Sequence, residues 1–504
     1  MDNLSHILGY RQEMPLLFTQ VYFWVFYMLV YLLFAFVYPK KRLRNAYLFL
    51  VSLFFYYKSG GYFFSLLILS TVVDYFVGRM IYSARKRTVK RLGVWISLTV
   101  NLGVLAYFKY TYFLVDMINR IFHTDLEAVN YLASWTNTLT GTHFDVSTII
   151  LPVGISFYTF QTISYTLDVY RGKLKPVRNI LDFGFYVSFF PQLVAGPIVR
   201  AASFIPQLNQ DFSLSVREFG HALFLILSGL VKKMLVADFI SIHLVDSVFQ
   251  EPVAYTGFEN LLALYGYSIQ IYCDFSGYTD IAIGLALLMG FRLPVNFNSP
   301  YKARNLSDFW RRWHISLSSW LRDYLYIPLG GNRKGKLRTF LNLFVTMLLG
   351  GLWHGAHIRF VLWGALHGLG LILLRIWQTL IKAPVRPGCF RRAISVFVTF
   401  HVVTFLWIFF RAGTWDAALS MIRKIGSDLS LQYLPAVIKA YYPALLVMVL
   451  AYILHWLPAV WKEKARGIFI GTPWWVKVLV IVLVVLLIVQ FKSVQVQPFI
   501  YFQF

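Results

Sequence analysis

The sequence predicts an all-α protein that crosses a membrane about 11 to 13 times. Hydrophobic residues make up 58% of its 504 residues and charged residues only 14%, whereas a soluble globular protein has roughly 25% charged residues. The mean hydropathy is +0.61, and apolar segments are spread along the whole chain. We therefore expect one integral membrane domain over residues 1–504, not a soluble enzyme with a single anchor.

The expected spans are apolar runs that approach the ~20 residues a helix needs to cross a ~30 Å hydrocarbon core. Helices are expected because an open backbone in lipid would leave its polar groups unpaired. Residues 257–290 are too many for a simple span, so re-entrant or interfacial helices are expected as well. The predicted spans are 15–38, 45–58, 62–83, 93–118, 148–170, 179–199, 218–244, 257–290, 338–356, 358–379, 394–411, 440–461 and 473–492.

The formal net charge of +25 would suit a nucleic-acid-binding protein, but the placement of the charges argues against that class. Most Lys and Arg residues lie in short loops between apolar runs, as in 39–45, 83–91, 170–179 and 461–467. Cytoplasmic loops carry such an excess of positive charge. The lipid bilayer is therefore the expected partner, and alternation of these loops places both termini outside the cytoplasm.

Residues 294–336 are neither a spanning helix nor a plain loop. From Leu306 their pattern predicts an amphipathic helix of the kind that lies in the membrane interface. His314 lies one turn from apolar neighbours, where a histidine is more often a hydrogen-bonded core residue than a catalyst. A histidine is nevertheless a suitable general base near neutral pH. Trp310, Trp313, Leu317, Trp320, Leu321 and Tyr324 would form the apolar stripe, and Arg311, Arg312, Ser318, Ser319 and Arg322 another face.

A second unusual stretch, "LLGGLWHGAHIRFVLWGALHG" (348–368), carries three histidines in an apolar context. A polar side chain at membrane depth is costly and is a functional-site hypothesis by default. The glycines predict close helix packing. His354 and His357 are three residues apart, but no nearby carboxylate or cysteine completes a metal site, so no bound metal is predicted. His367 is expected to bond a neighbouring helix.

These two stretches together resemble the membrane-bound O-acyltransferase (MBOAT) family, in particular its bacterial branch of alginate O-acetylation proteins and teichoic acid D-alanyl transferases. The resemblance runs in order through about residues 15–415, with helices at about 440–492 outside it. One departure is His357 and Ile358, where relatives commonly carry Asn-Trp. The other matching blocks are 152–172, 189–200, 271–290, 296–310 and 405–413.

The resemblance implies a ring of helices around a thinned centre with a central tunnel. It also implies that His354, in "WHG", is the catalytic base and that His314, in "RRWHISLS", is the second active-site histidine. We expect Trp310, Trp313 and Trp353 near the substrates, and the resemblance makes Asp274 and Ser276 part of the tunnel wall. For Tyr278 and Asp280 we expect only interhelical hydrogen bonds, and we expect the same of Asp74 and Asp168 or else a place at the interface.

The implied reaction moves an acyl group, most simply acetyl, from a cytoplasmic thioester to an extracytoplasmic polysaccharide, directly or through an extracytoplasmic partner enzyme. The donor, acetyl-CoA or an acyl carrier protein, is a substrate, and no tightly bound cofactor is expected. Donor phosphates would meet Arg311, Arg312, Lys302 or Arg322, although those arginines equally suit interfacial anchoring. The expected location is the inner membrane of a bacterium.

The alternative is a multi-pass transporter or flippase without a covalent step, because intramembrane polar residues also mark substrate pathways. Transporters often contain paired repeats with broken helices in corresponding positions. No such repeat is visible in this sequence, which favours the enzyme.

Overall fold

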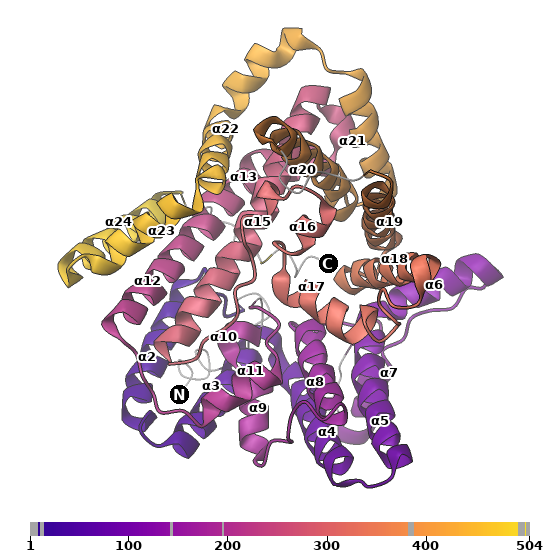
Figure 1. Cartoon of the computed structure of the whole chain (residues 1–504), viewed down its shortest axis with the longest axis vertical. Coiled ribbons are helices and arrows are strands. Elements are labelled where there is room, and N and C mark those ends of the chain that lie inside the picture. The colour runs from indigo at the N-terminus through magenta and orange to yellow at the C-terminus, as the bar shows by residue number, and fades with distance from the viewer. Residues whose placement is uncertain are drawn as a thin grey trace.

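The computed structural model describes residues 9–10, 15–141, 145–193, 196–381, 388–491 and 499. Regular structure in these ranges is entirely helical, which confirms the predicted all-α class (Figure 1). The two ends of the chain, predicted to be extracytoplasmic, fall outside the described residues.

The N-terminal part is a bundle of mostly apolar helices. Between α5 and α6 the backbone forms a π-helical turn, η2 (Ala106–Tyr110). The other elements are α2 (Val21–Val37), α3 (Lys41–Gly60), η1 (Gly61–Phe63), α4 (Phe64–Ser83), α5 (Arg87–Leu105), α6 (Thr111–Phe122), α7 (Tyr131–Thr140), α8 (Ile155–Tyr170), α9 (Ile180–Ser188), α10 (Phe190–Leu193) and α11 (Ala201–Leu208).

The central part contains one long, almost fully buried helix. This helix, α15 (Gly257–Leu288), is 89% buried over its most apolar window. It packs against α12 and against the irregular helical run that follows α12 along the chain. The elements before α15 are α12 (Val216–Leu230), η3 (Val231–Ala237), α13 (Asp238–Ile240), η4 (Ser241–Val245), α14 (Asp246–Gln250) and η5 (Pro252–Ala254).

The C-terminal part begins with short helices near the middle of the molecule and ends with long helices at its edge (Figure 1). The apolar windows of α22 and α24 are only 22% and 11% buried, so both present most of their surface to lipid. The elements are η6 (Pro300–Lys302), α16 (Leu306–Trp310), α17 (Ile315–Leu321), η7 (Arg322–Tyr326), α18 (Gly335–His354), α19 (Ile358–Leu380), α20 (Cys389–Arg411), α21 (Trp415–Ser427), η8 (Leu431–Tyr433), α22 (Leu434–Trp456), α23 (Ala459–Gly471) and α24 (Trp474–Phe491).

In the described part, seven helical runs are long and apolar enough to cross a membrane. One of them, Lys41–Ser83, contains both α3 and α4. The sequence predicts more spans than this. The described structure has fewer because several apolar runs fold into shorter or interrupted helices. For example, the predicted span 179–199 becomes α9, which has nine residues, and the short helix α10.

Glycines set the closest helix contact near the site, as the sequence predicts. A Cβ atom on Gly351 of α18 would clash with the carbonyl oxygen of Phe360 and the Cα of Gly364 on α19. A Cβ on Gly364 would in turn clash with the carbonyl oxygen of Met347. The two backbones therefore touch, and only glycine fits at either position.

Acidic side chains outside the site bond neighbouring helices, which confirms the expectation for Asp74, Asp168 and Asp280. Asp74 on α4 accepts hydrogen bonds from Ser97 and Asn101 of α5, at 2.5 and 2.6 Å. Asp168 on α8 accepts from the Tyr324 hydroxyl at 2.7 Å. Asp280 pairs with Lys232 at 2.5 Å. These bonds satisfy groups that would be costly to bury alone.

The predicted continuous amphipathic helix from Leu306 is wrong. The chain forms α16, turns at 311–314 and restarts as α17. His314 takes the left-handed conformation, with φ 43° and ψ 56°, at the N-cap of α17. The break is held by pairing with the preceding loop: the Ile315 amide donates to the Asn296 carbonyl at 2.9 Å, and the Asn298 amide donates to the Arg312 carbonyl at 2.9 Å.

Candidate active site

His314 is fully buried, and its surroundings define its tautomer. The Asn296 Oδ1 accepts from the Ser316 backbone amide at 3.1 Å and from the Ser316 hydroxyl at 2.9 Å. A backbone N–H can only donate, so the Asn296 side-chain atom that faces the Ser316 amide must be the oxygen and not the nitrogen. The same oxygen lies 3.2 Å from His314 Nδ1. Nδ1 therefore carries the proton in the neutral ring, and the lone pair is on Nε2.

His354 is the last residue of α18 and is 4% exposed. Gly355 then adopts an extended backbone, and His357 caps the start of α19, its Nδ1 accepting from the Arg359 amide at 3.3 Å. His354 and His357 consequently lie on either side of the turn that joins α18 to α19, and His357 is exposed. Among the described residues, no group of three or more His, Cys, Asp and Glu side chains is placed to hold a metal ion.

Trp353 packs near both histidines. Its ring centroid is 5.0 Å from that of His354 and 6.2 Å from that of His314. It packs on α8 through Phe157 at 5.5 Å and Phe160 at 5.3 Å. The structure thus brings together the two predicted histidines and one predicted tryptophan around a shared aromatic wall.

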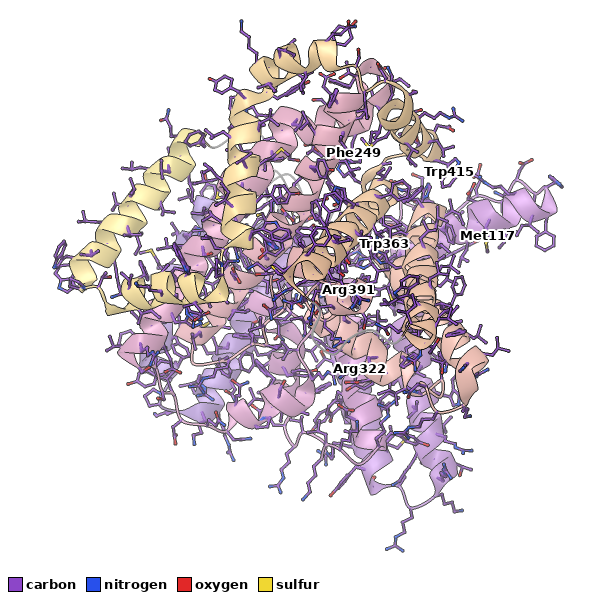
Figure 2. The ribbon with its side chains drawn as sticks, turned by 45° about the horizontal axis from the view of Figure 1, so that its top comes forward. Met117, Phe249, Arg322, Trp363, Arg391 and Trp415 are labelled. Atoms are coloured by element: carbon purple, nitrogen blue, oxygen red, sulfur yellow. The ribbon has the colours of Figure 1, made fainter. Side chains whose placement is uncertain are left out.

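The far side of His354 is also aromatic. Its ring makes edge-on contacts with Trp363 at 5.2 Å and Phe410 at 5.3 Å. Figure 2 shows Trp363 in the middle of the molecule, whereas Met117 lies on the projecting helix α6. Burial among apolar rings disfavours the imidazolium ion, so both histidines are kept in the neutral form that can accept a proton.

Lys109, which the sequence analysis did not single out, holds the end of α18. It lies in the π-helical turn η2, and its ammonium donates to the carbonyls of Trp353 at 2.7 Å and His354 at 3.0 Å. The adjacent Tyr110 hydroxyl donates to the Leu352 carbonyl at 2.9 Å. The last three carbonyls of α18 are therefore capped from another helix. A lysine inside the apolar run 93–118 was the available signal, because such residues are functional by default.

Phe275 and Asn296 were also missed as contacts of His314. The Phe275 ring stands edge-on to His314 at a centroid distance of 4.6 Å. The neighbouring Asp274, which the resemblance makes part of the tunnel wall, pairs with Lys233 at 2.5 Å. Ser276 is buried on the same helix. Successive helical residues point about 100° apart, so α15 turns Phe275 towards the site between these two polar neighbours.

The predicted donor-binding arginines lie on the turn that precedes His314. Arg311 is exposed and donates to the Ser307 hydroxyl at 3.1 Å. Arg312 pairs with Asp308 at 2.9 Å and donates to the Asn298 carbonyl at 3.2 Å. Arg312 thus stabilises the turn itself, while Arg311 has most of its donors available to a ligand.

The other two predicted tryptophans pack around the site. Trp313 is buried against Phe297 at 5.2 Å and Trp407 at 5.1 Å. Trp310 contacts the ring of His367 at 5.1 Å. His367 is fully buried among aromatic rings, and neither ring nitrogen has a hydrogen-bond partner among the described residues. The interhelical bond expected for it is therefore absent from the described structure.

Comparisons with known proteins agree with the resemblance of these motifs. The family model for membrane-bound O-acyltransferases (MBOAT) matches residues 177–412. A "probable alginate O-acetylase" of Pseudomonas aeruginosa is 42% identical over 384 residues, covering 76% of this chain and 69% of the relative. A peptidoglycan O-acetyltransferase of Helicobacter pylori is 36% identical over 413 residues, covering 77% and 74%. A teichoic acid D-alanyltransferase of Bacillus subtilis is 27% identical over 279 residues, covering 52% and 69%. This chain belongs to the membrane-bound O-acyltransferase family.

Proposed function

We propose that this protein is an O-acetyltransferase that takes an acetyl group from a thioester donor on the cytoplasmic side and transfers it towards an extracytoplasmic polysaccharide. The acceptor is the polysaccharide itself or an extracytoplasmic acyltransferase partner. Two relatives named for the O-acetylation of alginate and peptidoglycan support this substrate class. The basic loops support an orientation with the donor side in the cytoplasm of a bacterium and the chain in its inner membrane.

The convergence of His314 and His354 on Trp353 in the buried centre carries the proposal. In the reaction the hydroxyl oxygen attacks the thioester carbonyl carbon, and the carbon–sulfur bond breaks. His354 takes the hydroxyl proton during attack and returns it to the leaving thiolate. A positioned general base of this kind contributes typically 10²–10⁴-fold to the rate.

The tautomer of His314 favours a role in orienting the donor. Because its Nδ1 proton is directed at Asn296, Nε2 accepts a hydrogen bond and does not donate one to the carbonyl oxygen. The pantetheine arm shared by coenzyme A and acyl carrier proteins has amide N–H groups close to the thioester sulfur. Nε2 of His314 is suited to accept from such an N–H, and Arg311 is available for the donor phosphates.

The test is the acetyl content of the cell-surface polysaccharide in cells that produce the wild type, His354→Ala or His314→Ala at matched membrane abundance. We expect His354→Ala to abolish acetylation and His314→Ala to reduce it strongly. His243→Ala is the matched control, because His243 is exposed on η4 and outside the site. Normal acetylation with His354→Ala would reject the base and favour a transporter without a covalent step.

A further inference from the structure

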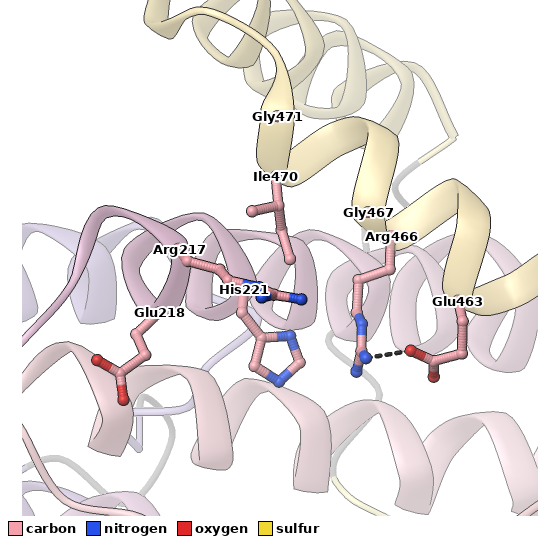
Figure 3. Close-up of a pocket in the computed structure, with 8 residues that line it drawn as sticks. All are labelled: Arg217, Glu218, His221, Glu463, Arg466, Gly467, Ile470 and Gly471. Atoms are coloured by element: carbon pink, nitrogen blue, oxygen red, sulfur yellow. Dashed lines mark hydrogen bonds and ion pairs between the residues drawn. The ribbon is translucent and has the colours of Figure 1, made fainter.

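A cavity of about 550 Å³ lies outside the candidate active site, between the start of α12 and α23. Figure 3 shows Arg217, His221 and Arg466 turned towards the same space, whereas Glu218 points away from it. The chemically relevant lining residues are Arg217, Glu218, His221, Glu463, Arg466 and Ile470.

The charges of this cavity leave one cation without a counter-ion. Glu218 is engaged by Arg292 at 2.5 Å and by the helix cap with Ser215. Glu463 pairs with Arg466. Arg217 is exposed and makes no hydrogen bond or ion pair within the described part of the chain. An anion in the cavity would therefore contact the uncompensated guanidinium of Arg217. It would also contact the guanidinium of Arg466, whose remaining N–H donors are available.

The position of α23 indicates where such an anion comes from. The helix exposes Trp461 and Ile468, 66% and 61% accessible, beside the basic residues Lys462 and Arg466. This composition is typical of a helix in the membrane interface. It leads directly into α24, an apolar helix of which only 11% is buried. Basic segments next to a membrane span attract anionic lipid headgroups.

The shape of the cavity also suits a lipid. Its wall on α23 contains Gly467 and Gly471, and a Cβ at either position would meet no atom within 4 Å. The floor where α12 approaches α23 is closed, since a Cβ on Gly220 would lie 3.3 Å from the Ile470 Cα. The cavity is thus closed at its base and open along α23.

We propose that this cavity binds the phosphodiester headgroup of an anionic phospholipid. Arg217 and Arg466 bind the phosphate, an arrangement that guanidinium groups form bidentately. The acyl chains extend along the exposed apolar surface of α24. The site is independent of the reaction centre and would tie the C-terminal helices to the inner leaflet of an anionic membrane.

The test measures lipid retention by the purified full-length protein in nanodiscs of phosphatidylcholine with a minor fraction of phosphatidylglycerol. Native mass spectrometry counts the bound lipids, and thermal unfolding is recorded with and without phosphatidylglycerol. We expect roughly tenfold weaker phosphatidylglycerol binding for the double variant Arg217→Gln/Arg466→Gln, because two charge-assisted contacts are lost. Lys464→Gln, which removes an exposed charge from the same helix, is the matched control and should bind as the wild type does.

A third variant, Arg217→Lys/Arg466→Lys, keeps the charge but not the bidentate geometry and should bind with intermediate strength. Equal phosphatidylglycerol binding by the Gln double variant and by Lys464→Gln would overturn the proposal. Inorganic phosphate is tested separately. If it raises the unfolding temperature of the wild type as much as phosphatidylglycerol does, the site is one for a free phosphate, and the lipid assignment is wrong.

Discussion

The Nδ1 atom of His314 lies 3.2 Å from the Oδ1 atom of Asn296, an oxygen that the Ser316 backbone amide holds in place. This relationship links the broken helix at 311–314 to the chemistry. The turn that separates α16 from α17 places His314 against the loop that contains Asn296. That loop then decides which ring nitrogen carries the proton.

We expect Asn296→Leu to lower the acetylation rate about 10–100-fold, by analogy with the loss of residues that orient metal-bound histidines. Asn296→Asp keeps an oxygen acceptor and should retain more activity. A carboxylate would also favour the imidazolium form, so the acidic limb of the pH–rate profile should move to higher pH. Activity measured against pH in membranes from both variants checks this. A Leu variant as active as the wild type would show that the tautomer is unimportant.

A second prediction concerns Lys109 as a positioning residue for His354. Lys109→Met removes the cation that binds the carbonyls of Trp353 and His354, so the end of α18 should loosen. We expect about a tenfold or larger loss of kcat with little change in the KM for the donor, because a misplaced catalytic group affects the reacting geometry first. Lys109→Arg should restore part of kcat.

The control for Lys109 is Lys90→Met, which removes a cation near the start of the adjoining helix α5, at the opposite end of that helix from η2. A loss of membrane abundance with Lys109→Met, without a change in kcat per molecule, would identify a purely structural cap.

The fold class was predictable, and the two candidate histidines could be singled out, because their signals are local. Hydrophobic runs and basic loops are visible in the linear order of the residues, and "WHG" and "RRWHISLS" are contiguous motifs. The break at His314 was not predictable from helical periodicity. It depends on backbone pairing with residues 296 and 298, and tertiary contacts of this kind override a local helical pattern.

Contacts that join distant segments were missed for the same reason. Lys109 reaches the end of α18 across more than 240 residues of chain, and nothing in its neighbourhood indicates that partner. The resemblance makes Asp274 part of the tunnel wall, but no local pattern indicates its ionic partner. The lysine that neutralises it, Lys233, lies on a different element. Periodicity shows which face a residue occupies, not what lies opposite.

A third prediction tests the contact of α18 with α19. Gly364→Val introduces side-chain atoms where the Met347 carbonyl and the Gly351 backbone already lie. The helices must separate, which should displace His354 and abolish activity while lowering the unfolding temperature. Gly426→Val, in α21 and at a site where a Cβ would meet no atom within 4 Å, is the matched control for unfolding temperature and acetylation activity. Wild-type activity in Gly364→Val would mean that the two helices can part without moving the site.

The last prediction separates two roles for Asp274. Asp274→Ala leaves buried Lys233 with Asp238, 2.7 Å away, as the other carboxylate that pairs with it. Removing one partner of a buried ion pair typically costs about 3–5 kcal/mol, and we expect lower abundance and a lower unfolding temperature. The triple variant Lys233→Met/Asp238→Asn/Asp274→Leu removes the lysine together with both carboxylates that pair with it and should regain stability. If the triple variant is stable and active, Asp274 serves packing of η3 on α15. If it is stable but has a raised KM for the donor, Asp274 contacts the substrate, as the resemblance implies.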